Sequence, residues 1–190
     1  MQVVIISGSP RANSNSLRLG KYFRQVFEAQ SHEVLDVIDL YENDFPRVGR
    51  PKPDVSALTA FQDRLIGAWR AAKIVIVIAP EYNWTTSGEL IDLLHVLGGR
   101  PFLDLFDRKV FAVAGSSSGR GGKMPAVEIS NVLSKIISFS NQVSLVSPRI
   151  IEAHEVGKNV DPDGNTTNNE VFEKTVADFV SYTVSIAELL

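Results

Sequence analysis

The chain of 190 residues is predicted to fold as a three-layer, doubly wound α/β domain around a five-stranded parallel sheet. Two observations predict this class. Continuous apolar runs recur along the chain, and such runs are typical of strands that are buried on both faces of a parallel sheet. Amphipathic helical stretches alternate with these runs, which favours right-handed crossovers and a helical layer on each face. We expect a single domain over residues 1–190.

Five segments are expected to form the strands: residues 3–7, 33–39, 74–79, 109–115 and 142–146. The first, third and fourth are unbroken apolar runs, as expected in the middle of a sheet. The second and fifth alternate more between apolar and polar residues, which indicates strands nearer an edge.

Five apolar stripes, spaced by three and four residues, predict the helices. They run from Leu19 to Phe27, Leu58 to Trp69, Leu90 to Leu97, Ile129 to Ile137 and Phe172 to Ala187. The third stripe stops at Gly98-Gly99, a common helix end. Residues 41–53 and 155–169 are rich in turn-forming residues, so we expect loops there.

Composition excludes several classes of function. Nineteen basic and 22 acidic residues give a net charge of −3 without a basic cluster, which disfavours nucleic-acid binding. The lack of cysteine excludes disulfides, thiolate zinc sites and cysteine-ligated iron–sulfur clusters, and fits a cytoplasmic location. No apolar run approaches the roughly 20 residues needed to span a membrane. The three histidines lack ligand spacing, so no metal site is expected.

The loop after the first strand offers the groups that hold a phosphate. Its donors are Ser9, Arg11, Ser14, Asn15 and Ser16, at the expected start of a helix. The free N–H groups and positive dipole end of that helix would add to them. Asn13 or Ser14 would also serve as a helix N-cap, but a cap needs only one residue. The loop matches neither G-x-G-x-x-G nor G-x-x-x-x-G-K-[ST], so neither a dinucleotide fingerprint nor a P-loop is predicted.

Two further loops follow the third and fourth strands. Residues 80–88 contain Tyr82 and Trp84, which can stack on an aromatic ring or simply pack against a neighbouring helix or subunit. Residues 115–123 contain four glycines, which let the backbone approach a ligand closely. Because the carboxyl ends of parallel strands share one edge, the three loops should converge on one crevice. Together they predict a bound flavin nucleotide.

Taken together, these motifs resemble the NADPH-dependent FMN reductase family, which includes quinone, azo-dye and chromate reductases on a flavodoxin-like fold. The resemblance rests on Gly8-Ser9-x-Arg11-x-x-Ser14-Asn15, on Pro80-Glu81-Tyr82-Asn83 and on the glycine-rich loop from Ser116 to Gly122. It covers residues 1 to about 146 and implies the strand order 2-1-3-4-5 with FMN bound non-covalently.

The resemblance also implies roles for individual residues. The FMN phosphate would be held by Ser9, Arg11, Ser14, Asn15 and Ser16. The ribityl chain and isoalloxazine would be lined by Pro80, Glu81, Tyr82, Asn83 and Trp84. The other edge of the ring would be closed by Ser116, Ser117, Gly119 and Gly122. No residue is expected to act as a general acid or base, since the cofactor carries the chemistry.

The implied activity is hydride transfer from NADPH or NADH through FMN to a quinone-like or other small acceptor. Family members are usually homodimers or homotetramers, and the helix that commonly lies at the interface departs from the family pattern at Ser87, Ile91, Asp92 and His95. The alternative is a flavodoxin-like electron carrier without NAD(P)H turnover. Arg11, the Pro-Glu-Tyr-Asn loop and the modest net charge disfavour a carrier, which usually presents a strongly acidic docking face.

Overall fold

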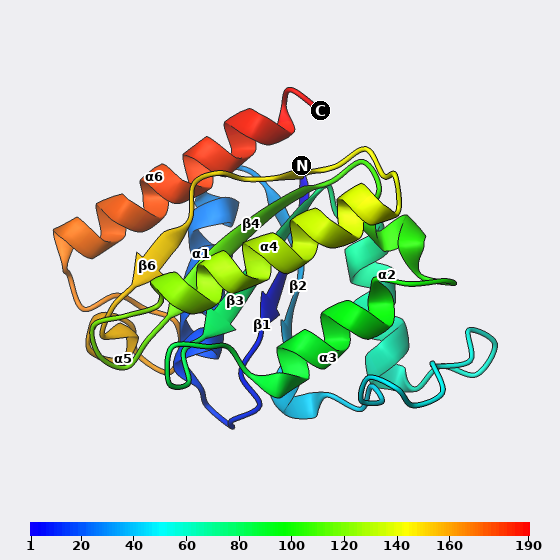
Figure 1. Cartoon of the computed structure of the whole chain (residues 1–190). Coiled ribbons are helices and arrows are strands. Elements are labelled where there is room, and N and C mark those ends of the chain that lie inside the picture. Colours follow the sequence, from blue (N-terminus) through cyan, green and yellow to red (C-terminus); the bar gives the residue numbers. More distant parts are fainter.

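A parallel β-sheet forms the middle layer of the molecule, and the computed structural model describes all 190 residues (Figure 1). Its strands are β1 (Gln2–Ser7), β2 (Glu33–Asp39), β3 (Ile74–Pro80), β4 (Val110–Ser116), β5 (Leu145–Val146) and β6 (Ile151–Ala153). The order is β2-β1-β3-β4-β5, and every neighbouring pair is parallel. The predicted flavodoxin-like order is therefore confirmed.

The prediction of one fifth strand over residues 142–146 is wrong in its extent. Only β5 pairs there with β4, and the chain pairs with β4 again further along as β6. The Ser147 amide donates to the carbonyl of Phe111 at 2.7 Å, but Pro148 has no N–H with which to continue the ladder. Four residues of this strand, 147–150, then stand opposite two of β4, so the edge bulges between its two short pieces.

Helices cover both faces of the sheet. One face carries α1 (Asn15–Ala29), α5 (Val156–Asn159) and α6 (Glu170–Ala187), and the other carries α2 (Ala60–Ala71), α3 (Gly88–Leu97) and α4 (Lys123–Phe139). Two 3-10 turns, η1 (Leu40–Glu42) and η2 (Leu103–Phe106), lie between them. The five predicted helices are confirmed. The short helix α5 corrects the prediction that residues 155–169 form only a loop.

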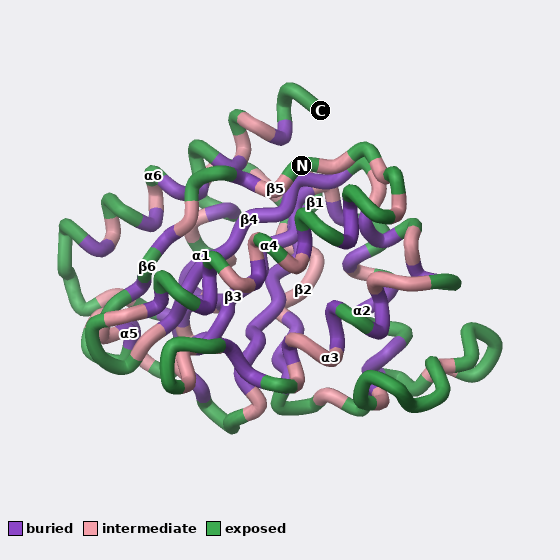
Figure 2. The backbone as a smooth tube through the Cα atoms, viewed as in Figure 1, coloured by how far each residue is buried: buried purple, intermediate pink, exposed green.

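The sheet divides the core into two clusters, and Figure 2 shows the buried strands between the helical layers. Along β1, Val4 and Ile6 pack with α2, α3 and α4, whereas Val3 and Ile5 pack with α1 and α6. All four side chains are fully buried, each contributing about 1.5–3 kcal/mol. Both faces of the strand are thus apolar, which explains the continuous runs in the sequence.

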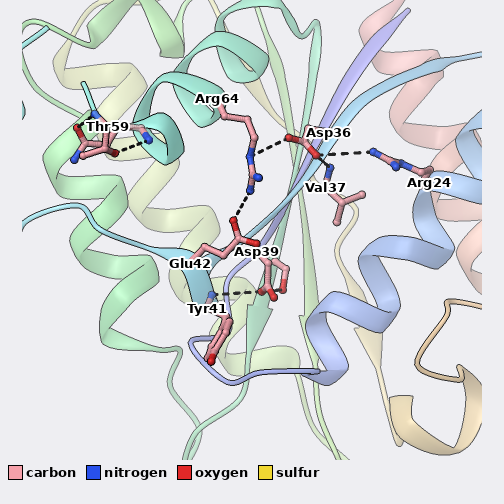
Figure 3. Close-up of polar contacts among 10 residues, drawn as sticks. Arg24, Asp36, Val37, Asp39, Tyr41, Glu42, Thr59 and Arg64 are labelled. Atoms are coloured by element: carbon pink, nitrogen blue, oxygen red, sulfur yellow. Dashed lines mark hydrogen bonds and ion pairs between the residues drawn. The ribbon is translucent and has the colours of Figure 1, made fainter. Parts of the chain in front are cut away.

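Charged residues protect the edge strand β2 (Figure 3). Asp36 lies 3.3 Å from Arg64 of α2 and 4.0 Å from Arg24 of α1, so it joins the helices on the two faces. Arg64 also binds Glu42 at 2.9 Å. Charges on an edge strand disfavour pairing with another chain. At the carboxyl end of β2, the Asp39 side chain accepts from the Tyr41 amide and starts η1.

Candidate functional site

The loop between β1 and α1 is held against strand β3. The Gly8 amide donates to the carbonyl of Ile78 at 2.9 Å, and the Ser87 hydroxyl donates to the carbonyl of Gly8 at 2.6 Å. A Cβ at position 8 would lie 2.6 Å from the Ile78 oxygen, so only glycine fits. The loop therefore begins at the crevice between β1 and β3, where the direction of strand order reverses.

Helix α1 begins beside this crevice. Ser14 is its N-cap and accepts from the Leu17 amide at 3.1 Å, so the capping interpretation of Ser14 is correct. A hydroxyl that accepts one hydrogen bond still has its own proton to donate, so capping leaves Ser14 able to bind an anion. The amides of Asn15 and Ser16 have no acceptor in the chain. Free amides at the positive end of a helix favour an anion.

Tyr82 connects the first loop with the second. Its hydroxyl lies 3.1 Å from the Ser9 hydroxyl, and the Arg11 guanidinium lies 4.6 Å from the centre of its ring. The Arg11 amide also donates to the Ser9 oxygen at 3.3 Å. Arg11 forms no ion pair, so its charge remains available to a ligand.

Residues 82–85 form a tight turn. The amide of Tyr82 donates to the carbonyl of Thr85 at 2.8 Å, and the Thr85 amide donates back at 3.1 Å. Both central residues are left-handed, with φ of 52° at Asn83 and 71° at Trp84, as in a type I′ turn. Trp84 is 79% exposed at the tip. The turn thus directs Trp84 to solvent, whereas the sequence predicts that it lines the ring.

The third loop comprises residues 116–122. Gly115, which precedes it, is in contact with Gly122 at its end. A Cβ at Gly115 would overlap the carbonyl of Gly122, and Gly122 has a φ of 102°. The Gly122 amide donates to the Glu81 carboxylate at 2.5 Å. The Ser116 hydroxyl is buried and has no partner. Because such a group costs about 1–3 kcal/mol, it marks a position for a polar atom of a ligand.

The three loops enclose a hollow of about 230 Å³. Its lining includes most of the residues expected to hold FMN, namely Ser9, Arg11, Ser14, Asn15, Ser16, Pro80, Glu81, Tyr82 and Ser116. Asn83, Trp84, Ser117, Gly119 and Gly122 do not line it. Ala12, Asn13 and Ser118 do, although they were not expected to. A second hollow of about 330 Å³ shares Arg11 and Tyr82 with the first, so these two side chains form the wall between them.

The three added residues belong to the predicted loops, and their side chains carry no decisive signal. Ala12 has no polar side-chain atom, and Asn13 reads equally well as a turn residue with its φ of 53°. Ser118 rather than Ser117 lines the hollow, because the backbone of Ser117 is hydrogen-bonded to β6 and α5. Knowing which serine of a run of three faces the crevice requires the position of β6.

The donors of the crevice suit an anion. Arg11 and the α1 amides supply positive charge, while the Glu81 carboxylate is held by the Gly122 amide. Behind the loop, the Ser7 hydroxyl donates to Asp39 at 3.1 Å. Burial raises the pKa of Asp39 above its usual range, against the opposing effect of that hydrogen bond. No group of three or more His, Cys, Asp or Glu side chains is arranged to hold a metal ion.

The strand order defines a flavodoxin-like α/β protein, and its crevice at the carboxyl edge of the sheet is a candidate anion site. Residues 1–147 match the NADPH-dependent FMN reductase family, and the chain belongs to that family. The match ends at the position where β5 gives way to the bulged edge. No helix of the chain combines the length and apolar character needed to cross a membrane.

Individual relatives agree with this assignment. The chain is 28% identical over 176 residues to a probable NADPH:quinone oxidoreductase 2 of Oryza sativa subsp. japonica, covering 92% of this chain and 83% of that protein. It is 33% identical over 125 residues to an NAD(P)H-dependent FMN reductase of Pseudomonas aeruginosa, covering 64% and 63%. Among solved structures, the flavoenzyme NAD(P)H:(acceptor) oxidoreductase FerB of Paracoccus denitrificans superposes with a TM-score of 0.74 at 19% identity, covering 98% and 97%. That last similarity shows the fold alone.

Proposed function

We propose that the chain binds FMN non-covalently in the crevice and passes reducing equivalents from NADPH or NADH to a small acceptor, such as a quinone or an azo compound. The observation that carries this proposal is the set of polar groups without partners around one hollow. The buried Ser116 hydroxyl and the free amides of Asn15 and Ser16 border it. The names of the relatives supply the substrate classes.

The residues of the crevice have distinct tasks in this proposal. Arg11 and the N-terminus of α1 neutralise the phosphate, and the hydroxyls of Ser9, Ser14 and Ser16 donate to its oxygens. Ser116 and the backbone after β3 bind the polar part of the nucleotide. Bound FMN supplies the hydride and electron chemistry, so the chain itself needs no general acid or base.

Retention of FMN tests the first half of the proposal. The purified chain is incubated with excess FMN and desalted, and its visible spectrum is then recorded. A retained and shifted flavin band is expected. Consumption of NADPH or NADH with a benzoquinone acceptor tests the second half, and parallel double-reciprocal plots are expected because both substrates use one site in turn. Loss of all flavin together with no NAD(P)H oxidation in its presence would contradict the proposal.

We also propose that the chain assembles as a homodimer or homotetramer through α3 and α4. Exposed apolar side chains of α4, among them Met124, Val127 and Phe139, support it. An apolar hollow of about 490 Å³ between the two helices is lined by His95, Val132 and Phe139, among others. Light scattering should give two or four times the chain mass of 20.9 kDa, and F139S should shift it toward the monomer. A monomer at all concentrations would refute this assembly.

A further inference from the structure

The third loop is braced from behind by β6 and α5, the part of the fold that the sequence did not predict. The Ser117 amide donates to the carbonyl of Ala153 at 3.0 Å, and the Val156 amide donates to the carbonyl of Ser117 at 3.1 Å. The amide of Glu155 donates to the carbonyl of Gly119 at 2.9 Å. The beginning of the loop is therefore fixed by backbone bonds.

The end of the loop is held by two side chains that can titrate. The Gly121 amide donates to Nδ1 of His154 at 2.9 Å, and the Gly122 amide donates to Glu81 at 2.5 Å. A Cβ at position 121 would overlap the Glu81 carboxylate in its present position, so a larger residue there would displace the Glu81 side chain. Two consecutive amides are thus clamped from opposite sides, one by the residue after β6 and one by the residue after β3.

Backbone geometry brings His154 to this place. Glu155 follows it with a φ of 46°, in the left-handed region that residues other than glycine rarely adopt. The sharp turn there presents the imidazole and the next two amides to the loop. A strained residue persists only where its surroundings fix it, here through the hydrogen bonds of Glu155 and Val156.

The bond from Gly121 constrains the imidazole. Because the amide donates, Nδ1 must carry the lone pair, and the ring proton of neutral His154 is on Nε2. A protonated imidazole carries hydrogen on both nitrogens and accepts at neither. The clamp on Gly121 therefore exists only while His154 is neutral.

We infer that His154 is a positioning residue for the flavin-binding loop, holding the Gly121 backbone near its end in place when neutral and releasing it when protonated. The inference rests on the proposed function, because the loop carries Ser116 and Ser118 on the wall of the crevice. Acidification removes the acceptor on Nδ1, so the Gly121 end of the loop should be looser at low pH than at high pH.

Charged groups of both signs lie on the elements that meet at His154. They are Arg120 in the loop, Glu81 after β3, Glu152 in β6, and Glu155 and Lys158 around α5. Arg120 and Lys158 are positively charged, whereas the three glutamates are negatively charged. Lys158 is itself bound to Glu155 at 2.6 Å, which reduces the effect of that pair.

Amide exchange in the protein without FMN tests the clamp directly. The quantity compared is the exchange rate of the Gly121 amide divided by its intrinsic rate at the same pH. We expect this ratio to be about fivefold higher at pH 5.5 than at pH 8, which corresponds to the loss of roughly one hydrogen bond. H154N keeps an acceptor at the δ position without titrating, and should show the slow rate at both pH values. H154A should show the fast rate at both. Equal protection in wild type and H154A, or a pH response shared by H154N, would overturn the inference.

Binding of FMN, followed by quenching of its fluorescence, tests the consequence. The dissociation constant of wild type divided by that of H154N should rise about fivefold from pH 8 to pH 5.5, and the ratio cancels the titration of the FMN phosphate itself. H32N, altered at the histidine before β2 that contacts the N-terminal amine at the other end of the sheet, should behave as wild type. A constant ratio would overturn the inference. If no variant binds FMN at any pH, the proposed function fails, while amide exchange still decides the role of His154.

Discussion

Two hollows at opposite ends of the sheet differ in whether the polar groups around them have hydrogen-bond partners within the chain. The larger, about 590 Å³, lies at the amino ends of β3 and β4 between Lys73 and Lys109. The smaller, about 230 Å³, lies at the carboxyl ends of the strands. In the larger one Lys109 donates to the carbonyls of Arg70 and Ala72 at 2.9 and 2.6 Å, and Arg70 pairs with Asp104.

The smaller hollow, by contrast, is bordered by groups that the chain leaves without partners, including the Ser116 hydroxyl and the first amides of α1. In the larger hollow Lys109 and Arg70 hold neighbouring parts of the fold together, whereas the unpartnered groups in the smaller one are left for a ligand. A cavity whose polar groups already satisfy one another is therefore a poor candidate for a binding site, whatever its volume.

The largest effect should come from Gly115 at the smaller hollow. In G115A the new Cβ overlaps the Gly122 carbonyl, so the third loop must move and FMN affinity should fall by about 100-fold or more. Fluorescence titration measures the affinity, and circular dichroism checks that the fold is retained. G119A is the matched control, since nothing lies within 4 Å of a Cβ there. Equal affinity in the two variants would contradict the close approach of the glycines.

Arg11 should be next in size. A hydrogen-bonded charge at a phosphate contributes about 1.5–3 kcal/mol, so R11M should bind FMN about 10- to 100-fold more weakly. Arg108 provides the control because it borders the larger hollow, and R108M should leave the affinity unchanged. If the two substitutions weakened binding equally, general charge rather than the local site would be responsible.

Lys109 tests the other hollow. K109M removes the amine from the last carbonyls of α2 and should lower the free energy of unfolding by about 1–3 kcal/mol at pH 7, with FMN affinity unchanged. Urea unfolding measures the first quantity and fluorescence titration the second. A loss of FMN affinity in K109M would show that the two ends of the sheet do not act independently.

The stability difference between wild type and K109M should depend on pH because the wild-type amine is buried. Burial lowers the pKa of Lys109 to about 8, below its unfolded value, so folding disfavours its charged form. That unfavourable contribution is present below pH 8 and is relieved as the pH rises toward 10.5. The stability advantage of wild type over K109M should therefore grow between pH 8 and pH 10. An advantage that shrank over this interval would show that the charge, not the hydrogen bonds, stabilises the fold.

Trp84 should have the smallest effect. Because its side chain is 79% exposed and lies outside the hollow, W84A should change FMN affinity less than about threefold. The same titration detects this, with Y82F as the comparison on the wall of the crevice. A tenfold loss in W84A would indicate that the turn reorganises when the flavin binds.

Much of the fold could be predicted because the strongest signals are local. Unbroken apolar runs identify β1, β3 and β4, and the stripes of α1 and α4 follow from residue spacing. The divided edge strand could not be predicted, because β5 and β6 depend on where each pairs with β4. Pro148 was a visible signal for an interruption, but not for the return of the chain at Ile151.

The candidate site divides in the same way. The residues on the wall from the first loop follow from their position between a buried strand and a helix start. The orientation of Trp84 depends on the reciprocal hydrogen bonds between Tyr82 and Thr85. It also depends on the left-handed backbone at Asn83 and Trp84, which could not be predicted from the sequence. The contact of His154 with the third loop joins residues 33 positions apart, through an unpredicted strand.

Position 87 has a consequence for the evolution of the chain. The Ser87 hydroxyl donates to the buried carbonyl of Gly8 and accepts from the Leu90 amide, so one oxygen fastens α3 to the first loop. Threonine preserves both bonds, while alanine abandons both at once. In this chain the start of α3 is therefore tied to the crevice by a side chain, and a relative with a residue other than serine or threonine at this position must satisfy the Gly8 carbonyl with a different donor.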